Sequence, residues 1–325
     1  MIRMVLALAL SLALAGPGRA ADRVVLMLNW YVYGEHAFFF YGKAKGIYAA
    51  AGIDLEIQEG RGSGATVQAV AAKTADFGYA DVTTMMRAAI KGAPIIAVGV
   101  LNQTTAMSAM GFADRNIRTP QDIKGKTVAI TPGDSLTQIW PLFLKKTGLK
   151  ESDVKIVAGD AQTKLNAVIN GRADLLLGAV MDQAMKIKDA TGKEAYCIRF
   201  ADYGINLVGD GIIANTDYVK ENPDLVRRFM AATRKAVEGA AAAPKEAVDA
   251  ILAADPKAGK PDTLLEGFNL AREFYATPQT KDKPPFSVTD QNMADTVALM
   301  VDYGGLDPRA KGDPKQFYTN DYLPK

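Results

Sequence analysis

One short segment near the amino terminus gathers residues that could do chemistry on a ligand. The sequence LNWYVYGEHAFFFYGKAKG, residues 28–46, holds His36, the only histidine of the chain, together with Trp30, Tyr33 and Glu35. A lone histidine in this setting could act as a general acid or base. It could also hydrogen-bond a flat ligand that stacks on the aromatic rings, or pack at the start of a helix. The sequence leaves these three roles for His36 open.

The residue types give little support to nucleophilic or metal chemistry. Ser63 lies in GRGSGAT, which lacks the G-x-S-x-G pattern of a nucleophile elbow. One histidine and one cysteine, Cys197, leave only scattered carboxylates as metal ligands. Cys197 lies in the apolar run AYCIRF, which is typical of a buried, unreactive thiol. We therefore expect no catalytic residue, no metal and no cofactor, while the paired carboxylates of a glycosidase, which leave no motif, stay open.

Two loops, GRGSGAT and PGDSLT, each come before a helical pattern and could bind a ligand through their backbone. Free N–H groups at a helix start favour anions or acceptor atoms, and glycine lets the backbone approach a ligand closely. Ordinary turn and capping chemistry explains such loops as well. Ser63 and Gly64 are the candidates in the first loop, and Ser135 in the second, where Asp134 or Ser135 is the expected helix cap.

The first loop also comes near a dinucleotide-binding fingerprint. Gly60, Gly62 and Ala65 follow an expected strand and precede a helix, and Asp81 ends the next strand. The spacing to Asp81 only approaches the roughly 20 residues of that motif. An NAD-type oxidoreductase is therefore an alternative that we do not favour.

Short apolar runs alternate with helical patterns from Arg23 onward, and this order repeats after about residue 126. The βα alternation predicts a mainly parallel sheet flanked by helices in each half. The last third is expected to be helical and to pack on one lobe. The expected strands are 24–30, 54–60, 76–80, 94–101, 126–132, 154–159 and 174–180, and the expected helices are 36–52, 64–74, 83–92, 135–148, 161–172, 181–192, 223–240, 244–254, 261–276 and 289–305.

The two halves echo each other locally. KTADFGYADVTTMM (73–86) and GRADLLLGAVMDQA (171–184) share the layout of a helix end, Ala-Asp, an apolar strand and a polar helix start. Asp76 and Asp174 are equivalent in this alignment. The echo indicates two lobes of similar build, with a cleft between them where the carboxyl ends of the strands meet.

Acidic side chains predominate where the strands end. Glu35, Asp81, Asp182 and Asp210 lie at or after strand ends, whereas Arg61 is the only base there. Carboxylates accept hydrogen bonds, and aromatic rings stack on flat molecules. This pattern favours a flat ligand with N–H donors over a nitrate or sulfonate anion.

The first twenty residues have the layout of a secretory signal peptide. A positive start, the apolar run VLALALSLALA and the small residues of GPGRA precede an expected cut after Ala20. The run is too short to span a bilayer, which needs about 20 apolar residues. Cleavage would remove two arginines and no acids and leave no net charge, which argues against a nucleic-acid partner.

The segment LNW…GEHAFFFYGKAKGIYAAAGIDLEI, followed by GSGATVQAVAAKTADFGYAD, resembles periplasmic solute-binding proteins of ABC importers. The resemblance runs from about residue 24 to 230. It points to the branch of nitrate, sulfonate and taurine binders and of binders of thiamine pyrimidine precursors. It implies a two-lobed, type II-like α/β fold with residues 22–108 plus 209–325 in the first lobe and 109–208 in the second. The C-terminal helices would pack on the first lobe, and the hinges would lie near SAMGFAD and NLVGDGI.

The resemblance also implies a function. The chain would be a periplasmic monomer that captures a small molecule by hinge closure and delivers it to a membrane permease and its ATPase. Fungal relatives make the thiamine pyrimidine from their own histidine with a cysteine-rich iron-binding motif, and the single cysteine here counts against that enzyme.

From the acids and rings together we expect a small flat nitrogen heterocycle as ligand and a non-enzymatic role. A sulfonate, taurine or nitrate anion is the alternative ligand. Trp30 would stack on the ring, His36 and Asp81 would hydrogen-bond it, and Asp182 would accept an amino group from the second lobe. The expected ligand-binding residues are Trp30, Tyr33, Glu35, His36, Ser63, Gly64, Asp81, Ser135, Asp182 and Asp210.

Overall fold

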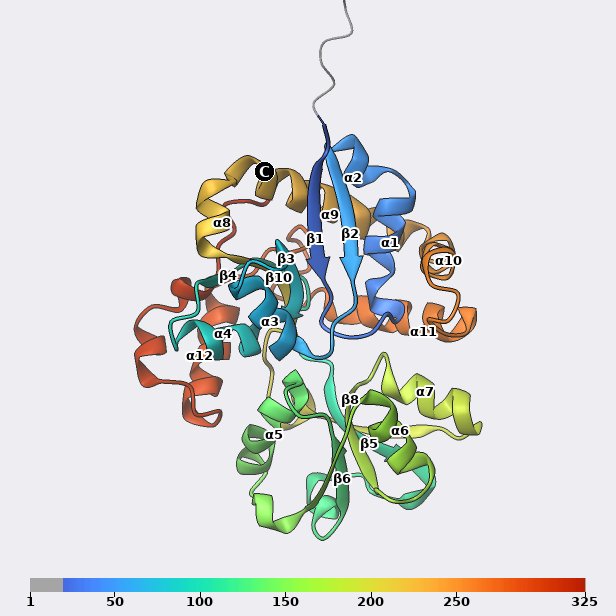
Figure 1. Cartoon of the computed structure of the whole chain (residues 1–325). Coiled ribbons are helices and arrows are strands. Elements are labelled where there is room, and N and C mark those ends of the chain that lie inside the picture. Colours follow the sequence, from blue (N-terminus) through green and yellow to red (C-terminus); the bar gives the residue numbers. More distant parts are fainter. Residues whose placement is uncertain (1–19, 325) are drawn as a thin grey trace, which may run out of the picture.

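The computed structural model describes residues 20–324 and divides them into two lobes, one above the other in Figure 1. The expected signal peptide lies outside the described residues, apart from Ala20. Within 20–324, no helix combines the length and the apolar character needed to cross a membrane. The two-lobed α/β fold expected from the sequence is thus present.

Each lobe is built on a five-stranded sheet, and the two sheets have the same order of equivalent strands. The first sheet runs β2-β1-β3-β10-β4 and the second runs β7-β6-β8-β5-β9. The first consists of β1 (Asp22–Met27), β2 (Ile53–Gln58), β3 (Phe77–Asp81), β4 (Ile95–Val100) and β10 (Asp210–Asn215), and the second of β5 (Met107–Phe112), β6 (Thr127–Ile130), β7 (Lys155–Ala158), β8 (Leu175–Ala179) and β9 (Ala195–Arg199).

One strand in each sheet runs against the others, so the sheets are mixed. β10 is antiparallel to β3 and β4, and β5 is antiparallel to β8 and β9, while β1, β2 and β3, and likewise β6, β7 and β8, are parallel. These reversed strands are the ones that the chain enters directly from the other lobe. β4 ends at the cleft and the chain crosses over, so β5 starts at the cleft and runs away from it.

The two crossings between the lobes lie side by side. Leu101 donates its backbone N–H to the carbonyl oxygen of Asp210 at 3.0 Å, and Gly209 donates to that of Asn102 at 2.8 Å. The first crossing, residues 101–106, comes just before the segment SAMGFAD, most of which lies inside β5. The second crossing includes NLVGDGI up to the start of β10.

The helix expected over residues 36–52 is divided in two. Gly46 has a φ of 67°, in the left-handed region, and ends the first helix before the second begins. Glycine adopts this conformation at little cost, so its position fixes the break. The helices around the first half of this lobe are α1 (Ala37–Ala44), α2 (Ile47–Ala50), α3 (Ser63–Ala71) and α4 (Val82–Ala89).

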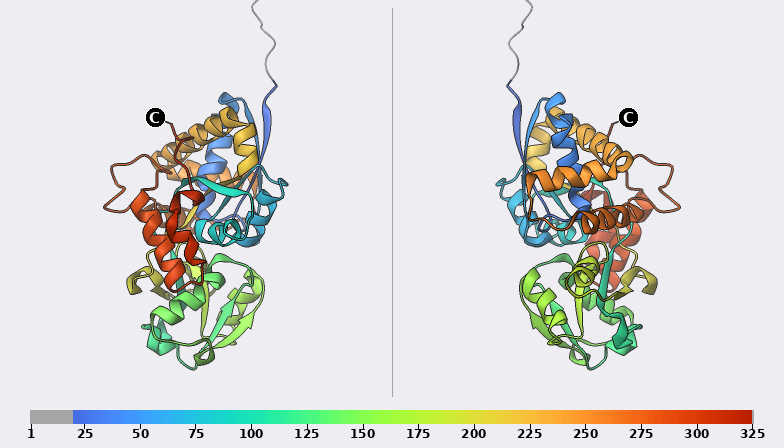
Figure 2. Two further views of the ribbon diagram at one scale, coloured as in Figure 1. Left: turned by 90° about the vertical axis from the view of Figure 1, so that its left-hand side faces the viewer. Right: turned by 90° about the vertical axis from the view of Figure 1, so that its right-hand side faces the viewer.

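The second lobe and the C-terminal third supply the remaining helices. Figures 1 and 2 show the C-terminal helices, coloured yellow to red, around the first lobe. They are α5 (Ser135–Lys146), α6 (Ala161–Ile169) and α7 (Gln183–Thr191) in the second lobe, then α8 (Thr216–Glu221), α9 (Pro223–Ala242), α10 (Pro244–Ala254), α11 (Pro261–Ala271) and α12 (Asp290–Asp302). Short 3₁₀ helices span Gly34–His36, Ala113–Arg115, Pro120–Ile123, Glu151–Asp153, Phe200–Tyr203, Arg272–Phe274, Pro308–Gly312 and Pro314–Phe317.

The C-terminal helices also touch the second lobe. A Cβ added at Gly267, in α11, would lie 2.6 Å from the carbonyl oxygen of Met181. On the hinge side, Leu142 and Phe143 of α5 share one apolar core with Val297 and Met300 of α12. The two lobes are therefore in close contact in this conformation.

Asp76 and Asp174 hold equivalent places in the two sheets. The Asp76 carboxylate accepts from the Val25 N–H at 2.8 Å, and its own N–H donates to the Val25 carbonyl at 3.0 Å. Asp174 forms the same reciprocal pair with Thr127, at 2.9 and 2.8 Å. Each aspartate thus joins the third strand of its lobe to the first.

Candidate ligand-binding site

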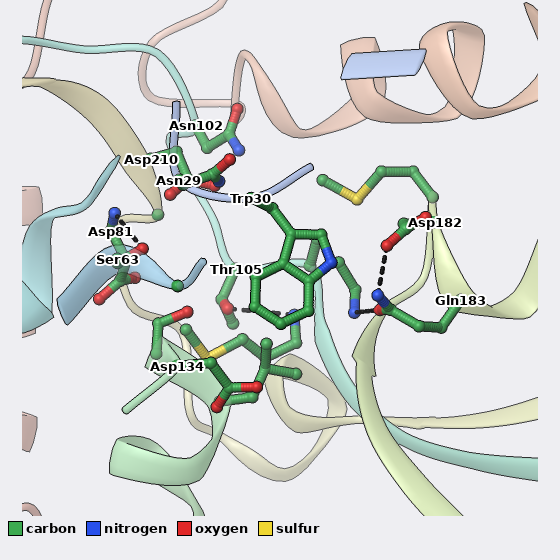
Figure 3. Close-up of a pocket in the computed structure, with 18 of the residues that line it drawn as sticks. Asn29, Trp30, Ser63, Asp81, Asn102, Thr105, Asp134, Asp182, Gln183 and Asp210 are labelled. Atoms are coloured by element: carbon green, nitrogen blue, oxygen red, sulfur yellow. Dashed lines mark hydrogen bonds between the residues drawn. The ribbon is translucent and has the colours of Figure 1, made fainter. Parts of the chain in front are cut away.

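A cavity lies between the lobes at the carboxyl ends of the parallel strands, with about 600 Å³ of atom-free space when the open solvent at its mouth is included. Figure 3 shows the indole of Trp30 in its middle. Among the ten residues expected from the sequence, Glu35, His36 and Gly64 do not line it. The lining is formed by Asn29, Trp30, Tyr33, Gly62, Ser63, Asp81, Asn102, Thr105, Ala106, Met107, Asp134, Ser135, Leu136, Lys164, Ala179, Met181, Asp182, Gln183, Gly209 and Asp210.

Trp30 follows β1 and reaches into the cavity from the first lobe. Its ring centroid lies 5.4 Å from that of Tyr31 and 5.2 Å from the ammonium nitrogen of Lys164. The indole Nε1 is buried and has no hydrogen-bond partner among residues 20–324. A large ring with an unused donor is suited to stacking on a flat ligand.

Asp81 and Ser63 form the first-lobe side of the cavity. The Oδ1 atom of Asp81 caps α4, accepting from the N–H of Thr84 at 2.8 Å and the hydroxyl of Thr83 at 2.5 Å. Ser63, at the start of α3, accepts from the Asp81 N–H through its hydroxyl at 3.1 Å. Burial raises the pKa of Asp81, and the bonds from Thr83 and Thr84 partly counter this rise. The other oxygen of Asp81, Oδ2, is therefore the one that remains to accept a hydrogen bond from a ligand.

The second loop repeats the helix-start arrangement in the second lobe. Asp134 is the cap of α5, because its Oδ1 atom accepts from the Thr137 N–H at 2.7 Å. Ser135 is the first residue of the helix and lines the cavity. The sequence left Asp134 and Ser135 as alternative caps of this helix, and the cap in the structure is Asp134.

Glu35 lies behind the cavity wall and supports it. Its buried carboxylate accepts from the hydroxyl of Tyr79 at 2.9 Å, from the amide of Asn102 at 2.7 Å and from the hydroxyl of Tyr33. Burial raises its pKa, while these three donors lower it. Burial, together with the nearby carboxylates of Glu35 and Asp81, holds the pKa of Asp210 well above its usual range.

His36 also lies behind the wall, and its ring is fully buried. Its Nε2 lies 2.8 Å from the Oδ1 atom of Asn29, an acceptor, so Nε2 carries the proton and donates. Asn29 lines the cavity, and its amide lowers the pKa of Asp210, against the larger effect of burial. Burial lowers the pKa of His36 to about 3, so the ring is neutral at physiological pH. In this conformation His36 orients Asn29 and stands apart from the cavity itself.

Asp182 ties the two lobes together. Its Oδ2 atom accepts from the hydroxyl of Tyr31 in the first lobe at 2.6 Å and from the amide of Gln183. Gln183 is held by the N–H of Ala179, which donates to its Oε1 atom at 2.9 Å. Burial raises the pKa of Asp182, and Lys186 counters this. The Oδ1 atom is buried and has no hydrogen-bond partner in the described residues.

Gly64 permits close contact between the two loops instead of lining the cavity. A Cβ at Gly64 would lie 2.6 Å from the carbonyl oxygen of Gly133 in the second lobe. The loops that the sequence singled out therefore meet each other across the cleft.

The sequence analysis looked for site residues just after strands, and it therefore missed one charged residue of the cavity. Lys164 reaches the site from the fourth position of α6, inside a helix, and a search of strand ends does not cover it. Arg61, the base that the sequence indicated, is exposed and does not line the cavity. Asn102 and Gln183 follow β4 and β8 closely, so a search of strand ends could have found both.

The cavity walls supply hydrogen-bond acceptors and one large aromatic ring. No group of three or more metal-ligating side chains occurs in residues 20–324. The only histidine bonds to Asn29, and Ser63 to a backbone N–H, so these two do not form a nucleophile–base pair. The carboxylates of the aspartates instead surround the cavity, and the ring of Trp30 stands in its middle.

Comparison with known proteins places the chain in a family. The family described as NMT1/THI5 like matches residues 34–247, more than half of the chain. The chain belongs to the NMT1/THI5-like family. The predicted resemblance to solute-binding proteins of this branch is confirmed.

The sequence relatives of this NMT1/THI5-like chain have names that indicate several functions. A putative binding protein of Brucella abortus is 25% identical over 99% of this chain and 98% of its own length. The formylaminopyrimidine-binding protein of Halalkalibacterium halodurans is 24% identical over 76% of this chain and 75% of its own. A 4-amino-5-hydroxymethyl-2-methylpyrimidine phosphate synthase of Legionella pneumophila is 23% identical over 74% of this chain and 76% of its own.

A solved structure shares the fold of this family member. The alkanesulfonate-binding protein SsuA of Xanthomonas axonopodis superposes with a TM-score of 0.68 at 16% identity. The match covers 90% of this chain and 96% of SsuA. At this identity the likeness supports the two-lobed fold alone.

Proposed function

We propose that this chain is the substrate-binding component of an ABC import system and captures a small flat nitrogen heterocycle related to thiamine pyrimidine precursors. The observation that carries the proposal is the Trp30 indole at the centre of an inter-lobe cavity whose walls include Asp81, Asp134, Asp182 and Asp210. A ring can stack on the indole while its amino groups donate to the carboxylates. The formylaminopyrimidine-binding relative supports the ligand class.

We also propose a cellular location and transporter partners for this chain. Residues 1–20 would direct export to the periplasm, and the mature chain would act as a monomer beside a membrane permease and its ATPase. The lobes would open to admit the ligand and close on it by hinge motion at the two crossings.

An anion is the second candidate ligand, and one observation favours it. Lys164 places a buried positive charge in the cavity, where the sequence had indicated acids. Alkanesulfonate, taurine or nitrate could use this charge. We favour the heterocycle because Asp134 lies 3.4 Å from the Lys164 ammonium and offsets it.

An enzymatic role is the rival of another class, since one relative is named as a synthase. The buried, neutral His36 is bound to Asn29 outside the cavity, which does not suit a histidine that acts on a ligand. Chromatography of the ligand after prolonged incubation separates the two roles. Unchanged ligand supports binding, and conversion to a product would establish an enzyme.

A thermal-shift panel on refolded, ligand-free protein tests the proposal. The panel compares aminopyrimidines, other flat heterocycles, alkanesulfonates, taurine, nitrate and NAD. A ligand at about 100 times its Kd stabilises the folded state by about 2.7 kcal/mol, which raises Tm by several degrees. A rise with aminopyrimidines supports the proposal, whereas a rise with sulfonates alone overturns the ligand class and keeps the clamp.

Variants of Trp30 test the stacking role directly. Trp30→Ala should weaken binding of a panel heterocycle by about 30-fold or more, as expected when a central aromatic anchor worth about 2 kcal/mol is lost. Trp30→Phe is the matched control and should keep much of the affinity because it retains a ring. Isothermal titration measures both, and full affinity in Trp30→Ala would show that the ligand lies elsewhere.

A further inference from the structure

Lys164 is a buried cation that the proposed heterocycle alone does not explain. Its side chain is 1% exposed, and it reaches the cavity from α6 in the second lobe. The surrounding acids would suit the donor groups of an aminopyrimidine without any lysine. A buried ammonium in this position needs partners of its own, because its desolvation is costly when it stays unpaired.

The contacts of Lys164 leave most of its hydrogen-bonding capacity unused. An ammonium has three N–H donors. The Lys164 nitrogen has one hydrogen-bond partner among residues 20–324, the Oδ2 atom of Asp134, at the long distance of 3.4 Å. The nitrogen also lies 5.2 Å from the ring centroid of the Trp30 indole, and its charge lowers the pKa of Asp182, against the larger effect of burial, without a hydrogen bond to that residue. Donors therefore remain for a molecule in the cavity.

We infer that Lys164 binds an oxygen substituent of the ligand, such as a hydroxyl, carbonyl or carboxylate group, and so selects among flat heterocycles. The inference rests on the proposed function and deepens it. A ring stacked on Trp30 has its substituents within reach of Lys164, which stands beside the same indole. The first lobe supplies the ring platform, and the second lobe recognises the oxygen when the clamp closes.

This arrangement gives a selectivity that stacking cannot supply. An indole stacks on almost any flat ring, whereas a buried donor without an acceptor disfavours the analogue that lacks one. Asp134 would then orient Lys164 from the cap of α5.

The test compares two ligands that differ by one oxygen. They are 4-amino-5-hydroxymethyl-2-methylpyrimidine and 4-amino-2,5-dimethylpyrimidine. Isothermal titration gives Kd for both with the full refolded chain, with Lys164→Met, and with Lys155→Met, the same substitution at an exposed second-lobe position away from the cavity. The first variant keeps the length of the side chain and removes its charge and donors.

We expect the unaltered chain and Lys155→Met to bind the hydroxymethyl compound at least tenfold more tightly than the dimethyl compound. Lys164→Met should lose at least tenfold for the hydroxymethyl compound and bind the two within about threefold of each other. A tenfold preference that survives in Lys164→Met overturns the inference. If Lys164→Met does not fold, Lys164→Gln takes its place, with the same loss of preference expected.

The outcome separates this inference from the proposed function. If the chain binds neither pyrimidine but binds an alkanesulfonate, the proposed ligand class is wrong. The same Lys164→Met titration with that sulfonate then decides the role of Lys164. A tenfold weaker affinity of Lys164→Met for the sulfonate supports the role of Lys164 in binding an oxygen of the ligand, and an unchanged Kd overturns that role. Binding of no probe would overturn both.

Discussion

The single histidine influences the candidate site through neighbours that line the cavity, Asn29 and Tyr33. His36 donates to Asn29, and Asn29 faces the cavity and lowers the pKa of Asp210, against the larger effect of burial. The sequence could show that His36 stands among aromatic rings. It could not show on which side of the wall the imidazole lies, because adjacent residues at a helix start point to different sides of the helix, and the sequence does not fix which side faces the cavity. The same ambiguity placed Glu35 in the expected lining, although it supports Tyr33 and Asn102 from behind.

The lowered pKa of His36 predicts a pH-dependent loss of stability. The folded value is about 3, against about 6.5 in an unfolded chain, so only the unfolded state takes up this proton between those values. Stability is therefore lost as pH falls through this window. Relative to His36→Gln, which keeps a donor near the Nε2 position, the unaltered chain should lose about 2 kcal/mol more between pH 7 and pH 5.

Urea unfolding of both proteins at the two pH values measures this difference. The comparison with the variant is needed because the raised pKa values of Glu35 and Asp210 act in the opposite sense, removing stability as pH rises. Equal losses in the two proteins would contradict the assignment of a buried, neutral imidazole.

At the scale of the elements, most strands and helices follow from the spacing of apolar residues. The alternation of short apolar runs and amphipathic stretches predicted β1 to β4 and β6 to β8 to within a few residues, whereas β5 and β10 were expected only from the family resemblance and β9 was not predicted. The division of the helix at Gly46 and the reversal of β5 and β10 were not predicted. A glycine inside a helical pattern is compatible with either outcome, and the direction of a strand depends on where the chain enters the sheet.

The paired aspartates Asp76 and Asp174 should each contribute to the stability of their sheet. Asp76→Ala and Asp174→Ala each remove the acceptor of a strand N–H, so each should lower the free energy of unfolding by about 1–3 kcal/mol. The two losses should add in the double variant, because the sites lie in different lobes. Chemical denaturation measures all three.

Asp54→Ala serves as the control for these variants. Asp54 lies on β2 and is exposed. This substitution should change the free energy of unfolding by no more than about 0.5 kcal/mol. A single variant at Asp76 or Asp174 that behaves like this control would show that the bond to its carboxylate adds nothing to stability.

At the scale of the whole molecule, the cavity exists because two backbones come close across the cleft. Lys164, the residue that the sequence missed, enters the site only through this approach of the second lobe to Trp30. No local pattern in the sequence records such a distance between lobes. Sequence reasoning could therefore identify the loops and acids of the site but could not identify their partners across the cleft.

Substitution of Gly64 should impair closure without harming either lobe. An added Cβ would lie 2.6 Å from the Gly133 carbonyl oxygen, a backbone atom that can move away only if the lobes separate. Gly64→Ala should thus weaken ligand binding by about tenfold, for an overpacking cost of about 1–3 kcal/mol in the closed state. The ligand-free protein should melt at the same temperature or slightly higher, because alanine favours the helix α3.

Titration calorimetry and small-angle scattering of the liganded protein check this prediction. Gly312→Ala is the matched control, since Gly312 is exposed and a Cβ there would meet no atom within 4 Å. Unaltered affinity in Gly64→Ala would mean that the loops relax while the clamp stays closed.

The reversed strand β10 separates the order in which the chain is made from the order in which its first lobe can be completed. β4 pairs with β10 and with no other named strand, and β10 lies between β3 and β4 in the sheet. A growing polypeptide that has passed residue 100 therefore carries a strand without its neighbour, and this gap persists while the entire second sheet is synthesised. The sheet that begins first is finished last, so a newly made chain keeps its first sheet incomplete until residue 215 is available.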